Sequence, residues 1–393
     1  MTDSACMNTN TDSDRSPYTF ETGPIRPPSE AQSLLVRVSR NCPWNKCTFC
    51  PVYTNTRFSR REVEDVVKDI DAMGRVRDYL KEKSSSLGIF DGVAAEAVRE
   101  LMAAEPDHGS IQQVALWLAA GGRTVFLQDA NSLLIKPGEL ILILERLRTV
   151  FPEVNRVTSY ARSHTLAKIP QDELKKLHQA GLNRIHVGLE SGSDKVLKRV
   201  KKGCTKADHI AAGRKVIQAG IELSEYVMPG LGGIELTDEH ADETADALNQ
   251  IDPHFIRLRT LGLAPGTSIR EEFEASEFIP LDEDGVVREI RRMIAGLSGI
   301  RSTIASDHIL NLLEEVEGTL DHDRKKILGV IDRYLAMDED DRLAFQLGRR
   351  LAGLRRLDEL KAPGVRAELT RLVKEAKKQG PDNILREILT RFI

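Results

Sequence analysis

Short apolar segments rich in β-branched residues recur at regular intervals along the middle of the chain. They begin at Thr124, Arg156, Arg184, Glu222 and His254, so their starting points lie 32, 28, 38 and 32 residues apart. This interval is the length of one strand followed by one helix. The intervening segments are amphipathic, and Pro, Thr and Gly residues stand at positions that suit helix ends. The pattern predicts a parallel sheet with right-handed helical crossovers.

One more strand is predicted ahead of this series. Residues 34–38 form an apolar run, and most of the segment 59–120 that follows is helical by pattern. Six strands fall short of the eight that close a full barrel. The predicted fold is therefore α/β, a partial (β/α)6 TIM-like barrel over residues 34–270 with a helical insertion at about 59–120. Ligands of such sheets bind at the carboxyl ends of the strands.

The two ends of the chain differ from this central region. Residues 1–33 are rich in Thr, Ser, Asp and Asn and contain four prolines, which predicts a disordered or extended lead-in. Beyond Pro265 and Gly266 the strand pattern stops. Residues 271–393 are highly charged with helical periodicity, which predicts a C-terminal all-helical domain. Within it, Ser306 or Asp307 is a candidate N-cap for a helix over 309–318.

Composition narrows the classes of function. The 393 residues include 56 Lys and Arg against 60 Asp and Glu, a formal net charge of -4. The near-equality of acidic and basic residues argues against a protein that coats nucleic acid without sequence preference and against a polybasic membrane binder. Nucleic acid is therefore not a favoured partner. The longest aliphatic run, 140–144, is too short to span a bilayer, and no signal peptide is visible. Five cysteines in a chain of this length do not make a disulfide framework, which favours the cytoplasm.

Three of these cysteines form the central chemical feature. Cys42, Cys47 and Cys50 directly follow the first predicted strand with the spacing C-x4-C-x2-C. Thiolates are soft ligands that suit zinc or iron–sulfur clusters. Three thiolates leave one iron of a [4Fe–4S] cube without a protein ligand, so that iron can bind a small molecule.

Other uses of the cysteines stay open at this point. A structural zinc site needs a fourth ligand, and the chain has no second C-x2-C pair to supply it. Cys47 and Cys50 alone have the spacing of a thioredoxin-like redox pair, which leaves Cys42 unexplained. The alternative to an enzyme is a non-enzymatic zinc or iron–sulfur binding module, or a redox sensor without turnover.

The cysteine loop resembles that of the radical S-adenosylmethionine (radical SAM) superfamily, in the broad group with tRNA methylthiotransferases and coproporphyrinogen dehydrogenases. The usual motif there is C-x3-C-x2-C with an aromatic residue before the last cysteine, the place that Phe49 takes here, and this chain has one additional residue between Cys42 and Cys47. The resemblance implies an enzyme in which Cys42, Cys47 and Cys50 hold a [4Fe–4S] cluster. It further implies reductive cleavage of S-adenosylmethionine (SAM), hydrogen abstraction from an unidentified substrate, and a low-potential electron donor of flavodoxin or ferredoxin type as partner.

The same resemblance implies SAM-binding residues at the strand ends. Glu190 and Lys202, twelve residues apart in a segment similar to those families, fall where relatives bind the SAM ribose and carboxylate. Asp129, after the second strand, is the candidate for the SAM ammonium, and Ser159, on the third, is a candidate for the ribose. Phe49 completes the predicted cofactor-binding set. A turn cap at Asp129 and an ordinary strand-end loop at Ser159 are the structural alternatives.

Overall fold

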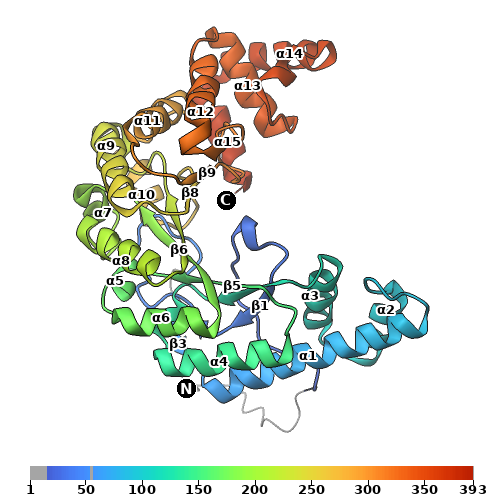
Figure 1. The fold of residues 1–393 in the computed structure, drawn as a ribbon. Coiled ribbons are helices and arrows are strands. Elements are labelled where there is room, and N and C mark those ends of the chain that lie inside the picture. Colours follow the sequence, from blue (N-terminus) through green and yellow to red (C-terminus); the bar gives the residue numbers. More distant parts are fainter. Residues whose placement is uncertain (1–15, 54–55, 393) are drawn as a thin grey trace, which may run out of the picture.

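The computed structural model describes residues 16–53 and 56–392 (Figure 1). Its main feature is an eight-stranded sheet in the order β1-β4-β5-β6-β7-β8-β9-β10. Neighbouring strands from β1 to β9 pair in parallel, and β10 pairs antiparallel with β9. The bounds are β1 (Leu34–Arg37), β4 (Thr124–Gln128), β5 (Arg156–Ala161), β6 (Leu182–Glu190), β7 (Glu222–Val227), β8 (Phe255–Leu258), β9 (Thr303–Ala305) and β10 (Gly318–Thr319).

The predicted partial barrel is confirmed, because β1 and β4 to β8 are the six predicted strands in the predicted order. Helices pack side by side along the outer face of the curved sheet (Figure 1). Each buries an apolar stripe against the strands, which places the main core between the sheet and this helical layer. These helices are α4 (Pro137–Val150), α6 (Gln171–Ala180), α8 (Lys206–Gln218), α9 (Gly233–Ile251) and α11 (Glu283–Gly296), with the short α5 (Ser163–Leu166), α7 (Asp194–Arg199), α10 (Ser268–Glu274) and η2 (Ser132–Leu134) in the connections.

The helical insertion is also present between the first two strands of the sheet. It consists of α1 (Val63–Ser86), α2 (Ala95–Ala104) and α3 (His108–Ala119). Helices α1 and α3 both contact β1, and α1 packs on α4. The insertion therefore continues the outer helical layer at the β1 edge.

Residues 16–21 of the N-terminal segment lie on α1 and α3, and residues 23–33, which include the short helix η1 (Pro28–Glu30), lie against the concave side of the sheet. Phe20 is buried in the main core. Glu30 is fully buried, 3.3 Å from the guanidinium of Arg156 and 3.5 Å from the ring of His186. Of the two predicted states, disordered or extended, residues 16–33 adopt the extended one, because these long-range contacts fix the chain. Residues 1–15 of that prediction lie outside the described residues.

The C-terminal helical region is confirmed. After α11 it contains α12 (Leu320–Leu335), α13 (Glu339–Leu351), η3 (Leu357–Lys361), α14 (Pro363–Gln379), α15 (Pro381–Leu389) and η4 (Thr390–Phe392). The short strands β9 and β10 interrupt the predicted all-helical pattern and extend the sheet. Among the described residues, no helix is long and apolar enough to cross a membrane.

The predicted helix over 309–318 is wrong, since this segment forms turns before β10. The buried Asn311 donates to the carbonyl of Leu258 over 2.9 Å and accepts from the backbone N–H of Thr260 over 3.0 Å. Asp307 pairs with Arg257 and Arg259 instead of capping a helix. These polar contacts to the end of β8 replace the backbone hydrogen bonds that a helix would form.

Candidate cofactor site at the cysteine loop

The three cysteines lie in a loop that leaves the carboxyl end of β1. A two-stranded ladder closes the neck of this loop, formed by β2 (Ser39–Arg40) and β3 (Ser59–Arg60). The middle of the loop is held as well. The N–H of Thr48 donates to the carbonyl of Val200 at the end of α7, and the N–H of Ile269 in α10 donates to the carbonyl of Thr48, each over 3.1 Å. The loop is thus fixed between two helices at the end of the sheet where ligands of parallel strands bind.

Cys42, Cys47 and Cys50 form no disulfide, and their side chains are partly buried. Burial raises the pKa of the Cys47 thiol to about 11, and the charge of Lys202 opposes this rise. Negative charge on Cys50 raises the pKa of Cys47, and charge on Cys42 raises that of Cys50, so the three sulfurs lie within electrostatic reach of one another. Loading a metal cluster must therefore displace protons from these thiols.

No three His, Cys, Asp or Glu side chains converge on a single metal-ion position within residues 16–53 and 56–392. A [4Fe–4S] cube makes a different demand, because each thiolate binds its own iron at a separate corner. Three soft, neighbouring thiols that form no disulfide fit that demand, and Cys42, Cys47 and Cys50 are the residues that would hold the cluster.

Glu190 and Lys202 form an ion pair beside this loop. The Lys202 Nζ lies 2.9 Å from the Glu190 Oε1 and 5.9 Å from the ring centre of Phe49. Both charged side chains are about one-tenth exposed, at 12% and 11%. Burial opposes the charge of Lys202, but Glu190 and Cys47 raise its pKa. The structure therefore brings together three predicted cofactor residues, Phe49, Glu190 and Lys202, with the cysteine loop.

A missing side chain makes room for this pair. A Cβ atom on Gly188 would lie 2.3 Å from the Glu190 Oε1 and 2.8 Å from the Lys202 Nζ. Glu190 itself has a φ of 62°, which interrupts the strand where β6 meets β7. Backbone in this region is uncommon for a residue with a side chain and is often found at functional sites.

Trp44 connects the cysteine loop to the backbone around Lys202. Its Nε1 donates to the carbonyl of Lys201 over 2.6 Å, and the Arg162 guanidinium lies 4.9 Å from the Trp44 ring centre. Arg162 also donates to the carbonyl of Lys202 over 2.7 Å. Gly203, at a φ of 72°, allows the ring to approach, since a Cβ there would lie 2.2 Å from it. The only feature of the sequence that could have indicated this contact is the position of Trp44 between Cys42 and Cys47.

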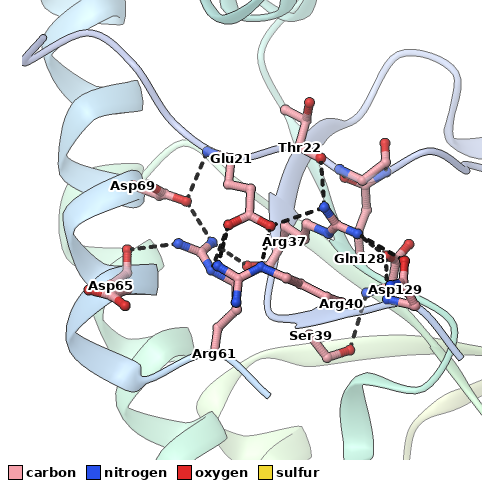
Figure 2. A network of polar contacts seen from close by, with 12 residues as sticks. Glu21, Thr22, Arg37, Ser39, Arg40, Arg61, Asp65, Asp69, Gln128 and Asp129 are labelled. Atoms are coloured by element: carbon pink, nitrogen blue, oxygen red, sulfur yellow. Dashed lines mark hydrogen bonds and ion pairs between the residues drawn. The ribbon is translucent and has the colours of Figure 1, made fainter. Parts of the chain in front are cut away.

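Asp129 occupies a different place from the one predicted. It is fully buried, and its Oδ2 accepts from the Arg37 guanidinium over 2.8 Å and from the N–H of Asn41 over 3.0 Å. Its Oδ1 accepts from the Tyr53 hydroxyl over 2.8 Å. Figure 2 shows Asp129 in the network around Arg37, together with Glu21 of the N-terminal segment. Its carboxylate is already engaged in holding the cysteine loop, which does not favour the predicted contact with the SAM ammonium.

Glu21 is the second acidic centre of the network in Figure 2. Its carboxylate lies 3.0 Å from the Arg37 Nη1, 2.6 Å from the Arg40 Nη2 and 3.4 Å from the Arg61 Nε. These three arginines lie on β1, β2 and just after β3. The N-terminal segment therefore neutralises positive charge at the neck of the cysteine loop, a role that the sequence did not reveal.

Ser159 is also placed away from the Glu190 corner. It is fully buried, and its hydroxyl donates to the carbonyl of Tyr160 over 3.1 Å. The rings of Phe126, Tyr160 and His186 contact one another and so share the concave face of the sheet. Because side chains alternate along a strand, Ser159 points toward the helical layer. This position does not favour the predicted ribose contact.

Cys204, outside the loop, belongs to a separate polar cluster. Its sulfur lies 3.2 Å from the Nε2 of His209, whose Nδ1 lies 2.5 Å from the hydroxyl of Ser163. Burial lowers the pKa of His209 to about 3 and raises that of Cys204 to about 11. The cluster is therefore neutral and joins α5 to α8 beneath Lys202.

Two curated relatives match the central part of the chain. The 4'-phospho-dehydrooxetanocin synthase of Priestia megaterium is 26% identical over 230 residues, covering 56% of this chain and 27% of the relative. The tRNA-2-methylthio-N(6)-dimethylallyladenosine synthase of Syntrophus aciditrophicus (strain SB) is 24% identical over 249 residues, covering 60% of this chain and 42% of the relative. The chain thus spans less than half the length of either protein.

Two solved structures also align with this chain. Elp3 of the archaeon Methanocaldococcus infernus has a TM-score of 0.41 at 15% identity, covering 64% of this chain and 60% of that chain. Methylornithine synthase (PylB) has a TM-score of 0.41 at 13% identity and covers 84% of each chain.

The family model described as the Radical SAM superfamily matches residues 36–248. This match spans more than half of the chain and contains the cysteine loop, the Glu190–Lys202 pair and four of the six predicted strands in full, β4 to β7. The chain therefore belongs to the Radical SAM superfamily, whose members use a [4Fe–4S] cluster and S-adenosylmethionine.

Proposed function

We propose that this protein is an enzyme that cleaves SAM reductively and uses the resulting radical to abstract a hydrogen atom from a substrate. The observation that carries the proposal is the proximity of the three cysteine thiols to a buried, ion-paired lysine and glutamate at the strand ends. When bound at Cys42, Cys47 and Cys50, the cluster supplies the electron and an open iron position for SAM.

The chain's own residues bind and orient the cofactor. The Lys202 ammonium offers a compact positive charge to the SAM carboxylate, and the Glu190 carboxylate accepts hydrogen bonds from the two ribose hydroxyls. The two side chains neutralise each other in the structure, and binding of SAM replaces this ion pair by a charge pair at Lys202 and by hydroxyl hydrogen bonds at Glu190. Phe49 supplies an apolar wall that excludes water beside Lys202. We assign Asp129 to positioning of the cysteine loop and give Ser159 no contact with SAM.

A one-electron donor of low potential is the partner that this reaction requires. A flavodoxin or a ferredoxin supplies electrons of this kind, and we propose one of these classes as the physiological reductant.

The four-residue spacing between Cys42 and Cys47 lengthens the loop by one residue relative to the usual motif, and Trp44 lies in this longer stretch.

Anaerobic reconstitution of the full chain with iron and sulfide, followed by dithionite and SAM, tests the proposal. We expect 5′-deoxyadenosine and methionine in the wild-type reaction and none with Cys50→Ala. Cys6→Ser, which changes a cysteine outside the motif, serves as the matched control and keeps product formation within about twofold of wild type.

Three outcomes contradict the proposal. Zinc as the sole metal in anaerobically purified protein supports a binding module. A reconstituted cluster that leaves SAM intact supports a redox sensor. A wild-type rate equal to that of Cys50→Ala removes the cysteine loop from the chemistry.

A further inference from the structure

A pocket with about 770 Å³ of empty space, its open mouth included, lies between the barrel and the C-terminal helices. One wall is the loop at 260–263, which follows β8. The opposite wall is formed by Leu385, Arg386 and Leu389 of α15. Clefts between domains are frequent sites for small molecules. Because the loop at 260–263 continues from the carboxyl end of β8, the pocket opens at the same end of the sheet as the cysteine loop.

The pocket and the cysteine loop share structural supports. Ile269 in α10 donates its N–H to Thr48 of the cysteine loop over 3.1 Å, and the next residue, Arg270, lines the pocket. Leu261 and Leu263 line the pocket and belong to the same apolar cluster as Phe49. The apolar cluster that lines the pocket therefore also reaches Phe49, beside Lys202.

The charged groups around the pocket are mostly paired. Arg350 pairs with Glu283 over 2.8 Å and also donates to two backbone carbonyls. Asp282 accepts from the N–H of Gly285 over 2.6 Å as the cap of α11. Arg270 pairs with Glu274, which lies outside the lining, over 2.6 Å.

Arg386 differs from these residues. Its guanidinium lies 5.2 Å from the ring centre of Phe273, and it has no hydrogen bond or ion pair to any described side chain or backbone atom. The wall around it is largely apolar, formed by Leu261, Leu263, Leu385 and Leu389. An arginine in such a wall offers a planar, two-pronged donor to a carboxylate or a phosphate.

We infer that this pocket binds the substrate, and that the substrate is a small molecule with an apolar body and a carboxylate or phosphate that pairs with Arg386. The inference rests on the proposed function only in naming the ligand a substrate. The apolar body fills the space between the loop at 260–263 and α15, and the anionic group takes the partner that Arg386 lacks.

Calorimetric titration of the reconstituted full chain with three probes tests this pocket. Decanoate, decyl phosphate and decanol share one apolar chain and differ in the head group. We expect at least one anionic probe to bind about tenfold more tightly than decanol. The tighter of the two anions identifies the head group.

The variants give the test its specificity. Arg386→Gln is expected to remove the tenfold preference and to leave decanol affinity within about twofold. Arg386→Lys is expected to keep part of the preference. Arg391→Gln changes an exposed arginine that does not line the pocket and is expected to behave as wild type.

Equal affinity for all three probes in the wild type overturns the inference, and so does an anion preference that survives in Arg386→Gln. Cleavage of SAM is measured separately, without the probes. If cleavage occurs and the anion preference is absent, this inference fails and the proposed function stands. If the preference is present and the wild type does not cleave SAM, the proposed function fails and the pocket stands as a binding site.

Discussion

The carboxylate of Asp129 accepts a hydrogen bond from the backbone N–H of Asn41, the residue directly before Cys42, over 3.0 Å. The same carboxylate accepts from the hydroxyl of Tyr53, three residues after Cys50, over 2.8 Å. One residue at the end of β4 thus fixes both ends of the segment that carries the three cysteines. Arg37 supplies the opposite charge that makes burial of this carboxylate tolerable.

Replacement of Asp129 separates its two candidate roles. Asp129→Asn keeps the size of the side chain but removes the charge that pairs with the mostly buried Arg37, and we expect a loss of about 3 kcal/mol in the free energy of unfolding. The loosened loop is expected to hold less than half of the wild-type iron after reconstitution. Iron, sulfide and SAM affinity per chain are measured together.

Tyr53→Phe is the matched control, because it removes one hydrogen bond to the same carboxylate and costs about 1 kcal/mol. If the Asp129→Asn protein keeps its full iron content but binds SAM more weakly, the positioning role is contradicted. That result supports the contact between Asp129 and the SAM ammonium instead.

Removal of the Lys202 charge is expected to weaken SAM binding. Lys202→Met keeps the apolar stem and loses a charged partner worth about 1.5–3 kcal/mol, so the SAM dissociation constant rises about tenfold or more. Iron content is expected to stay at the wild-type level. Lys198→Met, on the exposed face of α7, is the control and leaves SAM affinity unchanged. Equal SAM affinity in the wild type and Lys202→Met removes Lys202 from the site.

A single methyl group at Gly188 is expected to disturb the same corner. In Gly188→Ala the new Cβ collides with the Glu190 Oε1 and the Lys202 Nζ, so this ion pair must shift. We expect SAM affinity to fall about fivefold or more, because both groups that hold the cofactor move. Gly329→Ala, in the interior of α12, meets open space and stabilises the helix by about 0.5–1 kcal/mol without an effect on SAM. Unchanged SAM affinity in Gly188→Ala indicates that the cofactor does not use this corner.

Acidification is expected to destabilise the protein through His186 and Glu30. Burial lowers the pKa of His186 from 6.5 to about 4. Burial opposes the charge of Glu30, but His186, Ser33 and Arg156 lower its pKa from 4.5 to about 2. The unfolded chain therefore binds more protons than the folded chain between pH 6.5 and 2. The stabilisation from His186 is complete above pH 6.5 and is lost as the pH falls toward 4, while that from Glu30 is lost between about 4.5 and 2.

The His186 contribution alone corresponds to roughly 3 kcal/mol. Denaturant unfolding between pH 7 and 4 measures it. His186→Phe, which keeps a ring but cannot titrate, is expected to show a flatter pH profile in this window. His322→Gln, which changes an exposed histidine on α12, keeps the wild-type slope. A wild-type slope in His186→Phe contradicts the assignment.

The parts of the fold that the sequence predicted are those with short-range or repeated signals. The strand-to-strand interval of the βα units identified the sheet, and the clustering of Cys42, Cys47 and Cys50 located the loop. The pairing of Glu190 with Lys202 could also be predicted from the sequence, because the two residues lie on either side of one short helix, α7. Strand β9 has three residues, too few for an alternation to be recognised.

The contacts that the sequence did not predict join distant segments. Neither the composition around Glu30 nor that around His186 reveals that the two side chains meet inside the barrel. Asp129 was expected to face the cofactor because it ends a strand, but the direction of its side chain depends on Arg37 and Tyr53, which come from other elements. The pocket at Arg386 exists only because α15 returns to the loop at 260–263.

The course of residues 16–33 also restricts how other molecules reach the chemistry. Residues 23–33 lie on the concave side of the curved sheet, where Glu30 faces His186 in the middle of β6. A molecule that approaches the concave face of the sheet meets this segment. The carboxyl ends of the strands, in contrast, carry the loops that bear the cysteines and Lys202. SAM and the substrate therefore enter from the carboxyl ends of the strands, between these loops and the last helices of the chain.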